Sequence, residues 1–452
     1  MSNREPTRIV ILGGGFGGVY AALELERTLA RDPGVEVTLV CRDNFHLFTP
    51  MLHEVAASDL DFTDIVNPIR KLLRRVRLFV GDIESIDLET KRVHVSHGDE
   101  HHHHELEFDH LVLALGSITN LGNVPGLAER ALTMRTQGDA ILLRNRLIEN
   151  LETADFECCA DLRGPLLAVV VAGGGFAGVE TVAAVNDFVR EALRFYPRLS
   201  HMELRMILVH SGPVILPELG PKLGGYAQQK LAERGIEVRL GTRVTAVDGD
   251  RVRLSDGTEV RARTLVWTAG NAPNPLLEGL PCETDRGRII ADRCLRSPEW
   301  PGVWVVGDCA RVPDGRGGFC PPTAQHALRQ GKRVAQNIAA ALRGREPRPF
   351  EFKTLGQLAA IGRRAGVARI LGFQFSGFLA WWMWRTIYLA KLPRFEKKLR
   401  VMLGWTLDLV FSRDLVQLTT LRAPTVSHAE AVARDAAARS AGGAAALTRT
   451  PE

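Results

Sequence analysis

The sequence predicts an α/β protein with two Rossmann-like dinucleotide-binding domains, the second inserted in the first, followed by a helical C-terminal region. Three observations support this fold. The stretch IVILGGGFGGVY at residues 9–20 has a near copy, VVVAGGGFAGVE, at residues 169–180. Each copy places an apolar strand before a glycine-rich turn and a helix. The apolar stretch GVWVVGDCA at residues 302–310 then returns the chain to the first domain.

The first βαβ unit opens the chain. Its strand is predicted at residues 8–12, its turn at residues 13–18 and its second strand at residues 35–40. The apolar residues between turn and second strand have helical spacing. A further apolar strand at residues 110–117 closes this region. This order and length are those of a βαβ unit.

The second unit repeats the plan from Leu166. A buried strand leads into a turn at residues 173–178, and a longer helix and a strand at residues 204–209 follow. An apolar strand at residues 264–274 closes this region as the earlier one closes the first. The repeat therefore predicts a second domain of the same type.

These elements predict the domain boundaries. Residues 1–124 and 296–369 are expected to form the first dinucleotide-binding domain, and residues 125–295 the second. Residues 370–422 are expected to associate with a membrane. The Ala-rich residues 423–452 are predicted to form a disordered tail.

Length and composition set the broad class. A chain of 452 residues is too long for one core, so two or three domains are expected. The net charge of +5 gives little support for binding nucleic acid. The seven cysteines are scattered and form no C-x-x-C pair, which favours a reducing compartment. No apolar segment precedes the first strand, so no signal peptide is expected.

The C-terminal region combines an apolar run with cations. No charged residue occurs from Ile370 to Trp384. Six cations then accompany the single acid Glu396, namely Arg385, Lys391, Arg394, Lys397, Lys398 and Arg400. Four tryptophans lie in the same region, namely Trp381, Trp382, Trp384 and Trp405. The run is shorter than the roughly 20 residues of a spanning helix, so a helix in the membrane interface is predicted, with a solvated helix face as the alternative.

The two turns carry the pattern that lets a backbone approach a pyrophosphate at a helix N-terminus. Two such sites in one chain suggest electron transfer between a held flavin and a diffusible nicotinamide, whereas packing alone is the alternative. Flavin contacts are expected at Gly13, Gly15, Phe16, Gly17, Gly18, Arg42 and Gly116. Nicotinamide-nucleotide contacts are expected at Gly173, Gly175, Phe176, Ala177, Gly178, Glu180, His210, Ala269 and Gly270.

The two turns and the late strand resemble the two-dinucleotide-domain flavoprotein family typified by glutathione reductase, over roughly residues 8–342. The resemblance implies bound FAD, with Asp308, after Gly307, hydrogen-bonded to the ribityl chain. A helix N-cap is a compatible role for Asp308. Disulfide reductases of this family carry a cysteine pair where this chain has residues 44–61 without cysteine, so dithiol chemistry is not expected. Cys158 and Cys159, adjacent in a predicted loop, are interpreted as structural or surface thiols.

Two further segments resemble type II NADH dehydrogenases, single-chain enzymes that pass electrons from NADH to a membrane quinone. These are FHLFTPMLHEVA at residues 45–56 and PPTAQHALRQG at residues 321–331. Ala324, Gln325 and Ala327 match the quinone-site motif A-Q-x-A-x-Q, but Arg329 holds its last position and Gln330 follows one residue late. The resemblance places Ala324 and Gln325 near the flavin and Gln325 and Arg329 at the quinone. The C-terminal segment resembles the family's membrane-anchoring helices, to about Leu421.

By the same resemblance, Glu180 lies beside the nicotinamide and the flavin. A carboxylate there can orient the carboxamide or relay a proton, and its place near a helix N-terminus lowers the cost of its charge. An acid that only satisfies the helix dipole is the alternative. We predict that Glu180→Gln slows flavin reduction or perturbs NADH binding. Gln325→Ala is predicted to act mainly on the quinone half-reaction.

Both dinucleotide units lack the acid that usually ends the second strand and binds a ribose hydroxyl. The first unit has Cys41 and Arg42 there, and Arg42 is predicted to lie over the adenine. The second has His210 and Ser211, so the repulsion that excludes NADPH is missing. NADH is expected by resemblance, and NADPH remains an alternative.

The predicted function is a peripheral, non-pumping membrane flavoenzyme on the cytoplasmic side of the plasma membrane. It would pass hydride from NADH to FAD and electrons to quinone. The resemblance also allows a homodimer. The alternatives are a soluble NAD(P)H-dependent flavin reductase with a protein or small-molecule acceptor, and a non-catalytic redox sensor. No metal is expected, because the run His101–His104 is interpreted as a solvated hairpin loop.

Overall fold

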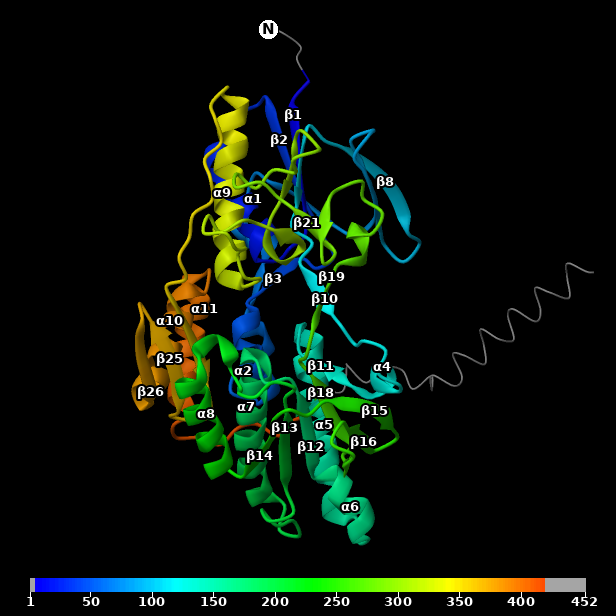
Figure 1. Cartoon of the computed structure of the whole chain (residues 1–452), viewed down its shortest axis with the longest axis vertical. Helices are drawn as coiled ribbons and strands as arrows, with labels where there is room; N and C mark the ends of the chain where they lie inside the picture. The colour runs from blue at the N-terminus through cyan, green and yellow to red at the C-terminus, as the bar shows by residue number, and fades with distance from the viewer. Residues whose placement is uncertain (1–4, 419–452) are drawn as a thin grey trace, which may run out of the picture.

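Two five-stranded parallel sheets carry the two nucleotide-binding domains in the computed structural model, which describes residues 5–418 (Figure 1). The first sheet has the order β22 (Val303–Val305), β9 (His110–Leu113), β1 (Thr7–Leu12), β2 (Val35–Cys41) and β5 (Arg77–Val80). The second has the order β11 (Leu132–Thr133), β18 (Thr264–Trp267), β12 (Ala168–Ala172), β13 (Arg205–Val209) and β14 (Ile236–Arg239). The predicted α/β fold with an inserted second domain is confirmed.

The central strands β1 and β12 are apolar because helices and loops cover both faces of each sheet. In the first domain, helix α1 (Phe16–Thr28) packs along α9 (Ala324–Leu342), as Figure 1 shows. In the second, α7 (Phe176–Ala192) follows β12 directly, and α5 (Gln137–Phe156) and α8 (Pro221–Glu233) complete the main helices. Each glycine turn therefore lies at the carboxyl end of a buried central strand, where doubly wound folds bind nucleotides.

Short elements surround these two cores. The short helices are α2 (Leu52–Ala56), α3 (Ile69–Leu72), α4 (Leu127–Arg130) and α6 (Ala160–Leu166). The small sheets of the first domain contain β3 (Phe45–Leu47), β4 (Val66–Pro68), β6 (Asp82–Asp87), β7 (Arg92–His97), β8 (His102–Glu107), β20 (Thr284–Asp285), β21 (Arg288–Ile290) and β23 (Ala310–Arg311). The second domain adds β15 (Val244–Asp248), β16 (Arg251–Leu254) and β17 (Glu259–Arg261).

The two domains are joined by a pair of short antiparallel strands, β10 (Ser117–Thr119) and β19 (Asn271–Pro273). Arg135 of the second domain donates to the backbone carbonyl of Ser117 at 3.0 Å and to Asn271 Oδ1 at 2.7 Å. One guanidinium thus holds both crossing strands together.

The return to the first domain lies near residue 273, so the predicted boundary at residue 295 is wrong. β21 pairs with β23, and Leu277, Ile289 and Leu295 pack in the core of the first domain. The sequence placed this segment with the second domain because its strands are too short to show a clear period.

The C-terminal unit begins with a sheet and not with a helix. Strands β24 (Gly356–Ala360), β25 (Gly366–Ile370) and β26 (Phe373–Gly377) form an antiparallel sheet, and α10 (Phe378–Lys391) and α11 (Phe395–Leu407) follow. Leu358 and Val367 belong to the core cluster that includes α7 and α2. Residues 356–369, predicted to belong to the first domain, therefore form part of this unit.

Two further predictions concern local segments. His102–His104 lie on strand β8 and not in a hairpin loop, and the rings of His97 and His104 stack at 4.9 Å. Cys158 and Cys159 are exposed in the connection between α5 and α6, as expected for a loop. The predicted disordered tail, residues 423–452, lies outside the described residues.

Candidate functional site

A cavity of about 680 Å³ lies where the two domains and the C-terminal unit meet. Phe16, Asp308, Ala324, Gln325 and Arg329 line it from the first domain. The second domain contributes Phe176, Ala177, Glu180 and Gly270. The structure thus brings residues of both predicted nucleotide sites and the predicted quinone residues to one cavity.

The three glycines of each turn have different surroundings. Gly13 and Gly173 have φ values of 113° and 121°, which residues with a Cβ rarely adopt. A Cβ on Gly18 or Gly178 would overlap the carbonyl oxygen of Gly13 or Gly173, so these positions need close backbone packing. A Cβ on Gly15 or Gly175 would meet no atom within 4 Å.

This combination fits a dinucleotide pyrophosphate. The middle glycine leaves backbone N–H groups accessible at the N-terminus of α1 or α7, where unpaired donors and the helix dipole favour anions. Packing alone would explain the close contacts of Gly18 and Gly178. It gives no reason for a glycine at the open positions Gly15 and Gly175.

The side of the cavity that belongs to the first domain contains a short chain of hydrogen-bonded polar side chains. Ser117 Oγ donates to Asp308 Oδ2 at 3.1 Å and accepts from Arg135 Nη2 at 3.0 Å. Gly307, with a φ of 78°, donates its N–H to Gln330 Oε1 at 2.8 Å. Sequence reasoning missed Ser117 and Arg135, because they become neighbours of Asp308 only through folding.

Gln330 explains the departure from the quinone-site motif. Its side chain is buried against the Gly307 loop, so it does not supply a displaced quinone contact. Arg329 lines the cavity instead, with its guanidinium 4.0 Å from the centre of the Phe352 ring. Gln325 donates to the carbonyl of Gly356 at 2.9 Å, and its backbone carbonyl accepts from Arg329 at 3.0 Å.

Glu180 is buried in α7 and is held by the C-terminal unit. Its Oε1 accepts from the indole N–H of Trp384 at 2.9 Å and from the backbone N–H of Ala360 at 3.1 Å. Burial raises its pKa to about 8, although both hydrogen bonds lower it. The carboxyl is therefore mostly protonated at neutral pH.

Two residues of the motif at residues 45–56 adjoin Glu180. His53 Nδ1 lies 3.8 Å from Glu180 Oε2, and burial lowers the pKa of His53 to about 3. Since both groups are neutral near pH 7, this approach is not an ion pair. Glu54 accepts from the indole N–H of Trp405 at 2.8 Å, and its burial raises its pKa. The resemblance had pointed to this segment without assigning these residues a role.

The tryptophans of the C-terminal unit divide into two groups. Trp384 and Trp405 are buried, so the prediction that the tryptophans lie at a membrane interface is wrong for these two. Trp382 is exposed, as predicted. The alternation arises because neighbouring helix positions point to different faces, which the sequence run alone did not separate.

The residues that replace the ribose-binding acids have other partners. His210 Nδ1 accepts from the backbone N–H of Gly174 at 3.1 Å, so the imidazole packs on the turn directly after β13. Arg42 Nε pairs with Asp82 at 3.0 Å and is exposed. Three other predicted nucleotide contacts do not themselves line the cavity. Gly17 packs near Val306, and Gly116 has a φ of 67°. Ala269 stands in the sequence between Thr268 and Gly270, which both line the cavity.

The buried acids predict an alkaline loss of stability. Glu54 has a folded pKa above its unfolded value, so the folded state keeps a proton that the unfolded state releases as pH rises. The free energy of unfolding therefore falls from the unfolded pKa up to the folded one. Glu54→Gln keeps the acceptor for Trp405 but cannot lose a proton. The fall in Tm between pH 6 and 9 should therefore be smaller in this variant, by about 2–4 °C for each kcal/mol of unfolding free energy that Glu54 loses over this range. Scanning calorimetry measures this, with exposed Glu89→Gln as the control. Equal slopes in wild type and Glu54→Gln would contradict it.

Comparisons with known proteins cover almost the whole chain. The pyridine nucleotide-disulphide oxidoreductase family model matches residues 7–331, and the NDH2 C-terminal domain model matches residues 355–414. A type II NADH:quinone oxidoreductase of Mycobacterium tuberculosis is 34% identical over 435 residues, covering 91% of each chain. One of Staphylococcus aureus is 27% identical over 85% of this chain and 94% of its own.

Solved structures agree on the fold. NDH2 from Plasmodium falciparum in complex with NADH has a TM-score of 0.85 at 19% identity, covering 91% of this chain and all of that one. The sulfide:quinone oxidoreductase from Aquifex aeolicus has a lower TM-score of 0.67, also at 19% identity, over 88% of this chain and 92% of its own.

Proposed function

The chain belongs to the type II NADH:quinone oxidoreductase family, and from this premise we propose how its residues carry out the reaction. The chain oxidises NADH and reduces quinone without a dithiol. FAD held by the first domain would supply the two-electron chemistry between NADH and quinone. The observation that carries the proposal is one cavity lined by Phe16 of the first turn, Glu180 after the second turn, and Gln325 of α9.

The two turns divide the nucleotides between the domains. The turn with Gly15 holds the FAD pyrophosphate and the turn with Gly175 holds that of NADH, since both have the open middle position. Asp308, oriented by Ser117, bonds the ribityl chain. The second domain then presents the nicotinamide at the cavity, beside Gly270 and Glu180.

Glu180 supplies the proton that the reaction consumes. NADH and quinone yield NAD⁺ and quinol only with one proton added to the hydride, so a proton donor is needed at the cavity. Because its pKa is about 8, the Glu180 carboxyl holds a proton at neutral pH. Its Oε2 lies toward His53, whereas Oε1 is occupied by two donors.

The quinone is placed at the part of the cavity formed by Gln325 and Arg329 of α9 and Tyr388 of α10. Replacing Gln325 by alanine removes an amide that can hydrogen-bond a quinone carbonyl. We expect KM for quinone to rise about tenfold, the effect of one hydrogen bond, while flavin reduction by NADH is unchanged. Stopped-flow measurement of the two half-reactions tests this.

The matched control is Gln336→Ala, on the same helix but bonded to Glu24 away from the cavity. Equal quinone kinetics in Gln325→Ala and wild type would remove Gln325 from the quinone site. In the same assay, NADH is compared with NADPH, because His210 occupies the position of the acid that usually excludes NADPH by repelling its 2′-phosphate. A wild type that reduces a protein or small-molecule acceptor but no quinone would favour the soluble reductase, and slow flavin reduction without turnover would favour the sensor.

The C-terminal unit has an apolar surface suited to lipid. Exposed apolar side chains follow the outer faces of α10 and α11, namely Phe378, Leu379, Trp382, Phe395, Leu399, Met402, Leu403 and Leu407. Those of α11 have the spacing of one helix face, and Lys398 and Arg400 interrupt them with positive charge. Every helix within residues 5–418 is too short or too polar to span a bilayer. We therefore assign the lipid-binding role to this apolar surface, on the cytoplasmic side where NADH is oxidised.

Two substitutions in this surface should release the protein from lipid. Phe395 is 79% exposed and, like Leu403, lies on the outer face of α11. Burying each in lipid contributes about 1.5–3 kcal/mol, so Phe395→Glu with Leu403→Glu should weaken vesicle binding at least about hundredfold. Flotation with vesicles containing an anionic phospholipid measures this. Met202→Glu, at a 91% exposed position of the second domain, should float like wild type. A wild type that stays unbound would reject the lipid role.

A further inference from the structure

We propose that Trp384 is a positioning residue for Glu180, so that helix α10 joins the lipid-binding surface to the proton-donating carboxyl. The proposal rests on the proposed function of Glu180. It assigns to the C-terminal unit a part in the reaction beyond attachment to the membrane.

Both hydrogen bonds that orient the Glu180 carboxyl come from the C-terminal unit. Trp384 of α10 and Ala360 of β24 donate to Oε1, whereas α7 itself only carries the side chain. This leaves Oε2 free, 3.8 Å from His53. A carboxyl with one oxygen fixed and the other free is held in one orientation, which a proton donor requires.

Trp384 is itself fixed on every side. It is fully buried, and its ring lies 4.7 Å from the ring of Tyr388 and 5.4 Å from that of His53. Tyr388 lines the cavity from the same helix. A buried tryptophan can also serve only to fill the core, a role that needs the ring but not its N–H.

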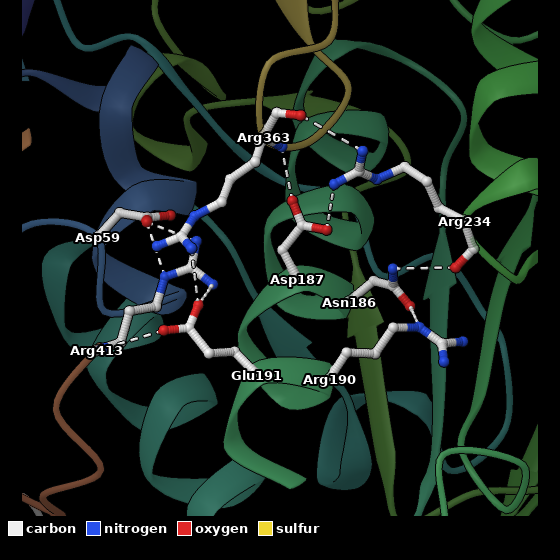
Figure 2. Close-up of polar contacts among 8 residues, drawn as sticks. All are labelled: Asp59, Asn186, Asp187, Arg190, Glu191, Arg234, Arg363 and Arg413. Carbon is white, nitrogen blue, oxygen red and sulfur yellow. Dashed lines mark hydrogen bonds and ion pairs between the residues drawn. The ribbon is translucent and has the colours of Figure 1, made fainter. Parts of the chain in front are cut away.

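The C-terminal unit is tied to the same face of α7 that carries Glu180. Asp187 and Glu191 follow Glu180 by seven and eleven positions, which returns to one face of a helix. Figure 2 shows Arg363, from the turn between β24 and β25, pairing with both acids. Its N–H donates to Asp187 at 2.7 Å and its guanidinium lies 3.0 Å from Glu191.

A second arginine of the C-terminal unit completes this attachment. Arg413 donates its backbone N–H to Glu191 at 3.2 Å, and its buried guanidinium lies 2.6 Å from Asp59, which follows α2 (Figure 2). Separating a buried ion pair leaves an uncompensated charge and is strongly destabilising, so Arg413 resists displacement from Asp59. The unit that carries Trp384 is therefore fixed relative to Glu180.

The same helix presents its other face to solvent. Trp382, two positions before Trp384, is 53% exposed and belongs to the lipid-binding surface. One helix therefore both forms part of the lipid-binding surface, through Trp382, and holds the Glu180 carboxyl, through Trp384.

The test compares Trp384→Phe with Trp405→Phe in the full-length, FAD-loaded protein. Each substitution removes an indole N–H that donates to a buried glutamate. Trp384 donates to Glu180, whereas Trp405 donates to Glu54. The groups that face Glu180 are His53 and Glu54 of α2 and Tyr388 of α10. In wild type, turnover with NADH and a soluble quinone should fall as pH rises through about 8, the pKa of Glu180.

Trp384→Phe removes a hydrogen-bond donor that lowers the pKa of Glu180. The pH at which turnover falls should therefore rise by about one unit. Trp405→Phe should not move the fall in turnover to higher pH. Glu180→Gln should abolish the fall in turnover, and adding Trp384→Phe to Glu180→Gln should then have no effect on the pH profile. An unmoved fall in Trp384→Phe, or a shift that persists in Glu180→Gln, would overturn the proposal. Absence of NADH:quinone turnover in wild type would instead reject the proposed function.

A measurement on the wild-type side chains covers the case in which Trp384→Phe does not fold. One indole ¹⁵N–¹H resonance should titrate with the same midpoint as turnover and should stop titrating in Glu180→Gln. If no indole resonance follows that midpoint, Trp384 does not position Glu180.

Discussion

Replacing Gly18 by alanine is expected to destabilise the first domain and weaken its binding of FAD. The added Cβ would overlap the carbonyl oxygen of Gly13, and both atoms belong to the backbone of the turn, so no side chain can move aside. Overpacking of this kind costs about 1–3 kcal/mol. We expect the variant to have a lower Tm and to lose FAD during purification, with an affinity weaker by up to about a hundredfold.

Gly15→Ala separates folding from cofactor binding. Its Cβ would meet no protein atom within 4 Å, so the Tm of the FAD-free protein should equal that of wild type. The Cβ would still occupy the space through which the pyrophosphate approaches the backbone. Absorbance at the flavin band after gel filtration, set against Tm, gives both quantities. If Gly15→Ala bound FAD normally, the turn would serve packing alone.

The two turns were predictable because their constraint is local. A positive φ, a close approach and an open position fall on three glycines within six residues, so the spacing alone specifies Gly13, Gly15 and Gly18. The central strands were predictable for a similar reason, since a strand buried on both faces is a continuous apolar run. The order of the two domains followed from repeating this local pattern.

The partners of Glu180 were not predictable, because they come from distant parts of the chain. Trp384 and Ala360 lie 204 and 180 positions away in sequence, and only the fold brings them together. The C-terminal tryptophans share a composition, but their division into buried and exposed depends on what packs against α10. Short strands such as β21 and β24 carry too few residues to show a period, which is why both domain boundaries shifted.

Gln330 lies one residue after the last position of the quinone-site motif, and this offset places it on a different face of α9. The offset of one residue from the motif rotates a side chain by about 100°, since a helix has 3.6 residues per turn. That rotation turns Gln330 inward to the N–H of Gly307 and leaves Arg329 at the cavity. Spacing could identify the departure, but only the structure shows which of the two residues lines the cavity.

Glu180→Gln is expected to lower turnover with quinone by about a hundredfold, the effect of losing a general acid. Glutamine has the same shape and keeps an acceptor for Trp384 and Ala360, so the fold and the nicotinamide site should be preserved. The sequence had suggested a loss in flavin reduction or NADH binding. A carboxyl that is protonated at neutral pH places the larger effect on the quinone half-reaction, where a proton is consumed.

Rapid mixing of the FAD-loaded variant with NADH, and then of the reduced protein with quinone, separates the two half-reactions of Glu180→Gln. We expect the first rate to change less than about threefold and the second to carry the loss of about a hundredfold. The loss should be largest below pH 8, because above that pH the wild-type carboxyl has also given up its proton. A variant with slow flavin reduction and normal quinone reduction would move Glu180 from proton donation to orientation of the nicotinamide. If Glu180→Gln had wild-type rates in both half-reactions, Glu180 would have no part in the chemistry. A side chain that only fills the junction with α10 can be replaced by glutamine without loss of rate.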